Sequence, residues 1–112
     1  MPVAEAHALH ELVRHAPLAQ SALARWLRLE KSTVSRLIAQ LEGKGWALRE
    51  RSTADGRMLL VQLTDDGRRV AAQIAAARQA RFARLLAQIP AADRARVVGA
   101  LAILVEAIDA SR

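Results

Sequence analysis

The hydrophobic pattern of this chain changes its period once, around the stretch "RERSTADGRMLLVQLT" at residues 49–64. Two short runs with alternating apolar positions flank a polar loop at residues 52–57. Trp46 and Leu48 are the alternating residues of the first run. Those of the second run are Leu59, Val61 and Leu63. Alternation of this kind predicts a β-hairpin, whereas the rest of the chain follows helical periodicity. We therefore expect a mainly α-helical fold with one two-stranded β-wing.

Three amphipathic segments precede the hairpin, and each places its apolar residues on one helical face. The first covers about residues 3–16 and ends before Pro17, because proline cannot continue a helix. The second runs from Gln20 to Leu29, without a capping residue at Ala19. The apolar face of the first consists of Leu9, Leu12, Val13 and Ala16, and that of the second of Leu23, Trp26 and Leu27.

The third segment, at about Lys31 to Lys44, follows the short turn formed by residues 28–30. Gly43 and Gly45 mark its end. Its buried stripe consists of Val34, Leu37, Ile38 and Leu41. Two short helices, a tight turn, a third helix and a hairpin together make a winged helix-turn-helix. In that motif the helix after the turn enters the major groove of DNA.

Two longer helices are expected after the hairpin, at about residues 65–88 and 92–110, with Pro90 between them. Thr64 is placed to cap the first of them. The acidic pair 65–66 stands in its first turn, where the helix dipole favours acids.

The last helix is apolar on two sides, which is more apolar width than one small core needs. We therefore expect a homodimer through residues 65–110. The positions expected to be buried in the dimer interface are Leu101, Leu104, Val105 and Ile108. In terms of domains, residues 1–64 are expected to form a DNA-binding region and residues 65–112 a helical dimerisation region, within one compact domain.

Composition narrows the class of protein. The formal net charge is +6, and 15 of the 17 basic residues are arginine. The excess of basic residues suits a polyanionic partner. Alternatively, arginine is simply the usual charged residue on the surface of this protein. The chain has no cysteine, which excludes disulfides and thiol chemistry. It lacks an apolar run of about 18 residues and a signal-peptide pattern, so we expect a soluble cytoplasmic protein.

No pattern in the sequence indicates an enzyme. His7 and His10 lie three residues apart on one helix, but no third zinc ligand stands near them. The pair Asp65–Asp66 is better explained by helix capping than by acid–base chemistry. There is no glycine-rich phosphate loop and no nucleophile–base pairing. We expect no catalytic residue, no metal and no cofactor.

The polar face of the third helix and the wing are the candidate DNA contacts. Serine and threonine can bond phosphates or base edges, arginine prefers guanine, and glutamine prefers adenine. Arg57, just past the loop's glycine, is placed to enter a narrow minor groove. Arg49 and Arg51, at the base of the wing, are expected nearer the phosphates. The full set of candidate residues is Lys31, Ser32, Thr33, Ser35, Arg36, Gln40, Arg49, Arg51, Asp55 and Arg57.

Two other readings remain open. The third helix can be an ordinary amphipathic helix with a solvated polar face. A winged helix can also be a protein–protein interaction module that does not bind DNA. Such a module would tend to expose aromatic or aliphatic residues on residues 31–44 and 52–57, where this chain has Ser, Thr, Arg, Gln and Asp.

The run "SALARWLRLEKSTVSRLIAQLEGKGWALRERSTADGRMLLVQLTDDGRR" resembles the core of the MarR-type bacterial transcription regulators. The matching pieces are Leu23-Ala24, the KSTVSRLI helix, the LE-x-KGW run at Leu41 to Trp46, the D-x-R at Asp55 and Arg57, and LT-x-x-G at Leu63 to Gly67. The resemblance covers nearly the whole chain.

The resemblance implies a homodimer in which each subunit places one winged helix on a half-site of a palindromic operator. It implies repression as the usual mode, and a small-molecule effector as a further partner. It also implies that Asp55 directs the guanidinium of Arg57. The family usually has a further helix ahead of the segment that matches residues 3–16, and this chain starts after it. Arg28 stands where the family often has glycine, and Glu30 where it often has serine or threonine.

Overall fold

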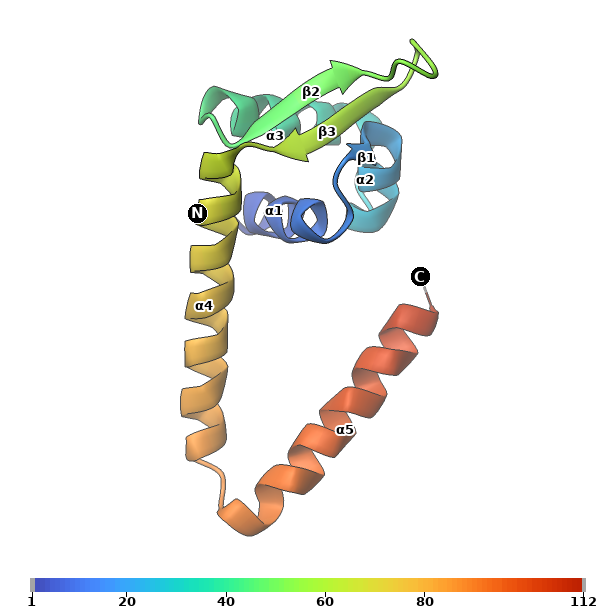
Figure 1. The fold of residues 1–112 in the computed structure, drawn as a ribbon. Coiled ribbons are helices and arrows are strands. Elements are labelled where there is room, and N and C mark those ends of the chain that lie inside the picture. Colours follow the sequence, from blue (N-terminus) through green and yellow to red (C-terminus); the bar gives the residue numbers. More distant parts are fainter. Residues whose placement is uncertain (1, 112) are drawn as a thin grey trace. The chain divides into compact units, whose positions relative to one another are not determined.

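The computed structural model describes residues 2–111, which form five helices and three strands (Figure 1). It divides into two compact units, Met1–Ala75 and Ala76–Arg112. The elements are α1 (Val3–His15), β1 (Leu18–Ala19), α2 (Gln20–Leu27), α3 (Lys31–Gly43), β2 (Ala47–Arg51), β3 (Leu59–Leu63), α4 (Asp65–Ala87) and α5 (Ala91–Ala110). This is the mainly helical winged helix-turn-helix that the sequence predicts.

The core of the first unit lies where α1, α2 and α3 meet the sheet. The stripe predicted for α3 is confirmed, because all four of its residues are buried. Other members of the core come from α1, α2, β2, β3 and α4. They are Ala8, Leu9, Leu12, Leu23, Ala24, Leu27, Ala47, Val61, Leu63 and Ala71.

The apolar face predicted for α1 is only partly right. Leu9 and Leu12 are fully buried, but Val13 is 56% exposed and Ala16 is also exposed. The buried face instead includes two carboxylates, Glu5 and Glu11. The predicted inward face of α1 is rotated by about one residue from the observed one. The prediction used only the apolar residues, whereas two acids also lie on the buried face.

Helix α2 ends two residues earlier than predicted. Arg28 adopts the left-handed conformation with φ 56°, which ends the helix at Leu27. The backbone N–H of Leu29 then bonds the carbonyl oxygen of Ala24 and closes the turn. Left-handed backbone is uncommon for residues with a Cβ, so glycine would be the less strained choice at position 28.

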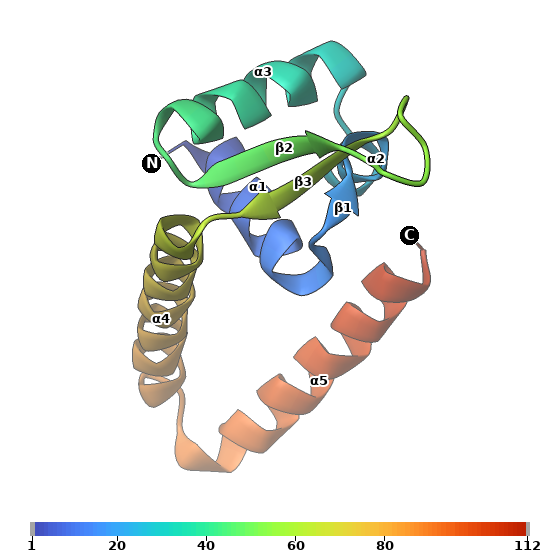
Figure 2. The ribbon, with the colours of Figure 1, turned by 45° about the horizontal axis from the view of Figure 1, so that its top comes forward.

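The sheet has three antiparallel strands in the order β1-β3-β2, whereas the sequence predicts two. The additional strand pairs Leu18 with Val61 and Ala19 with Leu60. Two residues are too few to show an alternating pattern, so this strand has no periodic signal in the sequence. In Figures 1 and 2 it lies beside β3, on the edge of the sheet opposite to β2.

The inward face predicted for β2 is wrong by one residue. Ala47 is 2% exposed, whereas Leu48 is 46% exposed. Ala47 pairs with Leu63, and Arg49 pairs with Val61. Directly paired residues lie on the same face of a sheet, so Arg49 shares the core-facing side with Ala47. The prediction failed because the residue that faces inward is a small alanine between two larger apolar residues.

The start of α4 is fixed against the hairpin. Thr64 Oγ1 accepts a hydrogen bond from the backbone N–H of Gly67 at 3.0 Å, which confirms Thr64 as the cap. A Cβ added at Gly67 would lie 1.9 Å from the carbonyl oxygen of Trp46, so only glycine fits this contact. Val70 and Ile74 also pack against the core. For this reason the first unit extends to Ala75, rather than to the boundary expected after residue 64.

In the second unit Arg94 closes the connection between α4 and α5. Its guanidinium donates to the carbonyl oxygens of Leu86, Ala87 and Ile89 at 2.9–3.3 Å. Pro90 then precedes the first turn of α5. Among the described residues, no helix combines the length and the apolar character that crossing a membrane requires.

Candidate nucleic-acid interface

Helix α3 presents the polar face that the sequence predicts. Lys31, Ser32, Arg36 and Gln40 are exposed, and Thr33 and Ser35 are partly exposed. Thr33, Arg36 and Gln40 line one open hollow of about 280 Å³ together with Ala4, Leu29 and Leu37. The structure thus brings three of the predicted residues together on one accessible face of α3.

The first turns of α2 and α3 are both arranged in a way that suits an anion. Neither helix has a side-chain cap hydrogen bond or an acid in its first turn. Their first backbone N–H groups therefore keep their capacity to bind an acceptor. Lys31 is the first residue of α3, where a cation opposes the helix dipole. A phosphate beside this residue would remove that unfavourable interaction.

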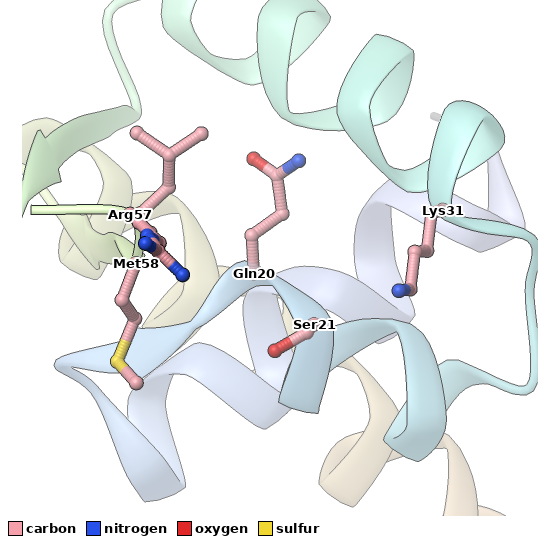
Figure 3. A pocket seen from close by; sticks show the side chains of 6 residues that line it. Gln20, Ser21, Lys31, Arg57 and Met58 are labelled. Atoms are coloured by element: carbon pink, nitrogen blue, oxygen red, sulfur yellow. The ribbon is translucent and has the colours of Figure 1, made fainter. Parts of the chain in front are cut away.

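A shallow hollow of about 180 Å³ joins these two helix starts to the wing. Figure 3 shows Gln20 and Ser21 between Lys31 on one side and Arg57 with Met58 on the other. The lining contains two cations, a hydroxyl and an amide, and no carboxylate. A negatively charged backbone that follows the hollow would meet α2, α3 and the wing together.

Gln20, Ser21 and Met58 were not among the predicted site residues. The uncapped start of α2 after Pro17 is a signal that could have identified the first two, since free N–H groups at a helix start bind phosphates. Met58 follows the predicted Arg57 and has no chemical signal of its own in the sequence.

The loop of the wing is held by its own polar groups. Ser52 Oγ accepts hydrogen bonds from the backbone N–H groups of Ala54 and Asp55, both at 3.2 Å. Arg51 Nη1 donates to the carbonyl oxygen of Gly56 at 2.9 Å. In Figures 1 and 2 the loop projects beyond the sheet at the end near α2. The wing is thus a defined turn and not a loose segment of chain.

Asp55 has a different contact from the one expected. Its Oδ1 accepts from the backbone N–H of Arg57 at 3.0 Å, and no ion pair to the guanidinium of Arg57 forms among residues 2–111. The carboxylate therefore shapes the turn that presents Arg57. The guanidinium of Arg57 stays exposed at the rim of the hollow.

Arg49 is also placed differently from the expectation. It faces inward, its side chain is 21% exposed, and its guanidinium bonds Glu42, Ser35 and Gln20. The predicted position near the phosphates came from the charge of the residue. Its direction is set by the register of β2, which places it on the same side as Ala47.

The expected dimer residues all lie exposed on α5. Leu101 is 37% exposed, and Leu104, Val105 and Ile108 are 55%, 54% and 46% exposed. No residue of α5 is buried in this structure. The helix therefore carries a large apolar surface that its own unit leaves exposed.

The three histidines of α1 do not gather a metal-binding set. The rings of His7 and His15 lie 3.7 and 3.5 Å from the carboxylate of Glu11, and the ring of His15 stacks on Trp26 with centroids 4.8 Å apart. Within residues 2–111, no group of three or more His, Cys, Asp or Glu side chains is placed to hold a metal ion.

Comparison with known proteins gives the family. The sequence model of the MarR family matches residues 1–59. The protein named "Uncharacterized HTH-type transcriptional regulator YdgJ" of Bacillus subtilis is 33% identical over 92 residues, which cover 81% of this chain and 56% of that relative. The chain thus spans little more than half the length of this curated relative.

Solved structures share the fold of this chain. RV1404 from Mycobacterium tuberculosis matches with a TM-score of 0.87 and 30% identity, over 96% of this chain and 73% of that one. FabT from Streptococcus pneumoniae, solved in complex with DNA, matches with a TM-score of 0.84 over 100% of this chain and 78% of that one. At 20% identity the second likeness shows the fold alone. The MarR family model matches more than half of the chain, and YdgJ is 33% identical to it; the chain therefore belongs to the MarR family.

Proposed function

We propose that this chain is a sequence-specific DNA-binding transcriptional regulator that acts as a homodimer, most simply as a repressor that blocks a promoter. The observation that supports it best is the carboxylate-free hollow joining the starts of α2 and α3 to Arg57 of the wing. Such a surface suits the phosphate backbone, while the outer face of α3 supplies donors and acceptors that can read base edges.

The candidate residues divide into two roles. Arg36 and Gln40 lie one turn apart on the exposed face of α3 and are proposed to read bases in the major groove. Lys31, Ser32, Thr33 and Ser35, near the start of α3, are proposed to contact phosphate or base edges. In the wing, Arg57 is proposed to enter the minor groove and Arg51 to lie near the phosphates, while Asp55 shapes the turn between them.

The homodimer is proposed to form through α4 and α5. The uncovered apolar residues of α5 support it, since soluble proteins rarely expose an apolar face of this extent without a partner for it. A two-fold dimer would bind a near-palindromic operator with half-sites about 34–36 Å apart, one turn of DNA. A regulator of bacterial genes works where the chromosome is, so we place the protein in the cytoplasm.

The alternative is an interaction module that does not bind DNA. The polar, basic character of the outer face of α3 and of the wing favours DNA over an apolar partner surface. Selection from a pool of random-sequence DNA duplexes, followed by binding of the enriched duplex at two salt concentrations, separates the two. Enrichment of a near-palindrome with salt-sensitive affinity supports the proposal. A pool that stays random after repeated rounds contradicts it.

A further inference from the structure

We infer that Arg49 is a positioning residue that sets the recognition helix α3 against the wing, and that it does not contact DNA. This inference rests on the proposed function, because the placement matters for reading a DNA sequence. Arg49 would thus have a role different from that of the exposed cations Lys31, Arg36 and Arg57, although the sequence predicts all four as DNA contacts.

The guanidinium of Arg49 connects three elements. From β2, its Nε donates to Glu42 Oε1 on α3 at 2.9 Å, and its Nη2 lies 2.8 Å from the same oxygen. Its Nη1 donates to Ser35 Oγ at 3.1 Å and to the carbonyl oxygen of Ser35 at 3.4 Å. The same nitrogen donates to Gln20 Oε1 on α2 at 3.2 Å.

These contacts leave little capacity for a phosphate. A guanidinium has five N–H donors in a planar fork, and here each of its three nitrogens already has an acceptor within the protein. Glu42 also neutralises its charge. In contrast, Lys31, Arg36 and Arg57 have no side-chain acceptor or carboxylate partner within residues 2–111.

The residues that Arg49 holds are next to the proposed DNA contacts. Ser35 precedes Arg36 on α3, and Gln20 lines the hollow between Lys31 and Arg57. Arg49 itself lies two residues before Arg51, where β2 ends and the loop of the wing begins. A rigid fork at this position therefore fixes the spacing between the base-reading helix and the wing, which both have to meet one duplex.

The effect of Glu42→Ala on sequence preference tests this inference. If Arg49 contacts phosphate, removal of Glu42 frees a cation beside DNA, so affinity should rise for every duplex. If Arg49 is a positioning residue, the same change loosens α3 against the wing. The preference for the enriched duplex over a shuffled duplex of equal composition should then fall, by about tenfold, the scale of one lost base contact.

Arg49→Lys and Arg49→Ala complete the test. Lysine keeps the charge and serves well as a point charge on phosphate, but it cannot form the fork. We expect Arg49→Lys to lose most of the sequence preference. We also expect the dependence of log affinity on log salt to remain that of the parent in both variants. Loss of one phosphate contact would instead reduce that slope by about 0.9.

Asp66→Ala is the matched control. It also removes an acid paired with an arginine, because Asp66 Oδ1 lies 2.7 Å from Nη1 of Arg69 in an exposed pair on α4. The sequence preference of this variant should equal that of the parent. Far-UV circular dichroism and thermal unfolding confirm that each variant is folded at the temperature of the binding assay. If an alanine variant is unfolded there, Glu42→Gln and Arg49→Lys decide the question.

A higher affinity of Glu42→Ala for both duplexes, with its sequence preference unchanged, would overturn the inference. So would an unchanged sequence preference in Arg49→Lys, or a reduced salt slope in Arg49→Ala. The failure of the proposed function is a separate result, since it shows in the parent protein as the absence of any enriched duplex. If the parent enriches no duplex, both proposals fail. If the parent enriches a duplex normally but one of the three contrary results is found, only the proposed role of Arg49 fails.

Discussion

The ammonium group of Lys44 lies 2.7 Å from the carboxylate of Glu5, and this pair joins the end of α3 to the first turn of α1. The two partners differ in their access to water. Glu5 is only 2% exposed, whereas the side chain of Lys44 is 43% exposed. The ammonium also lies 5.0 Å from the ring centroid of Trp46, just before β2. Lys44 thus compensates a buried charge at the end of α3.

Lys44→Ala is therefore expected to destabilise the protein more than Glu5→Gln. The alanine variant leaves a buried carboxylate without its cation, at a cost of about 1–3 kcal/mol. The glutamine variant removes the buried charge and leaves Lys44 free to turn to solvent. Urea unfolding of both variants at neutral pH measures the difference. Equal stabilities, or a larger loss in Glu5→Gln, would contradict this account of the pair.

Gly67→Ala is expected to be strongly destabilising. Its Cβ would meet the backbone carbonyl of Trp46 at 1.9 Å, and neither backbone can move without shifting the start of α4. We expect a loss of about 2–3 kcal/mol or more, the scale of severe overpacking. Gly43→Ala is the control, because a Cβ there meets nothing within 4 Å and alanine favours helix. Thermal unfolding should show a fall for the first variant and none for the second.

Arg36→Ala is expected to weaken binding to the enriched duplex by about 1–3 kcal/mol. It should also relax the sequence preference at one position of each half-site. The physical reason is the loss of a bidentate base contact from the exposed face of α3. Fluorescence anisotropy on the enriched and shuffled duplexes measures both. Equal losses on the two duplexes would make Arg36 a phosphate contact.

Arg57→Ala is expected to weaken operator binding strongly while leaving the fold and the dimer intact. Asp55→Ala should weaken it more mildly, because Asp55 shapes the turn through the backbone N–H of Arg57 and leaves the guanidinium present. Both variants can be compared with the parent at one salt concentration. Unchanged affinity in Arg57→Ala would show that the wing does not touch DNA.

Leu104→Glu is expected to convert the dimer to a monomer, because it places a charge in the proposed interface of α5, where Leu104 is 55% exposed in the single chain. Glu106→Lys, on the same helix, changes charge at a polar position and should remain dimeric. Sedimentation at micromolar concentration distinguishes the two states. A parent protein that is already monomeric there would remove the dimer from the proposal.

The fold was predictable from sequence where large apolar residues define a face. The stripe of α3 is of this kind, because its four members are leucine, isoleucine or valine at helical spacing. The inward face of β2 was not predictable, because its inward residue is the small Ala47. Strand β1 was not predictable either, because two residues are too few to show a periodic pattern. At the site, residue type identified Lys31 and Arg57 as cations on one surface. The inward direction of Arg49 depends on strand register, which charge alone does not reveal.

The most direct test of the central claim is the affinity of the parent protein for its enriched duplex and for a shuffled duplex, measured between 50 and 200 mM salt. For a sequence-specific regulator the enriched duplex should bind at least about a thousandfold more tightly at physiological salt, with affinity for both duplexes falling steeply as salt rises. Equal affinity for the two duplexes, or binding that does not change with salt, would contradict the proposal that this chain reads DNA sequence through α3 and the wing.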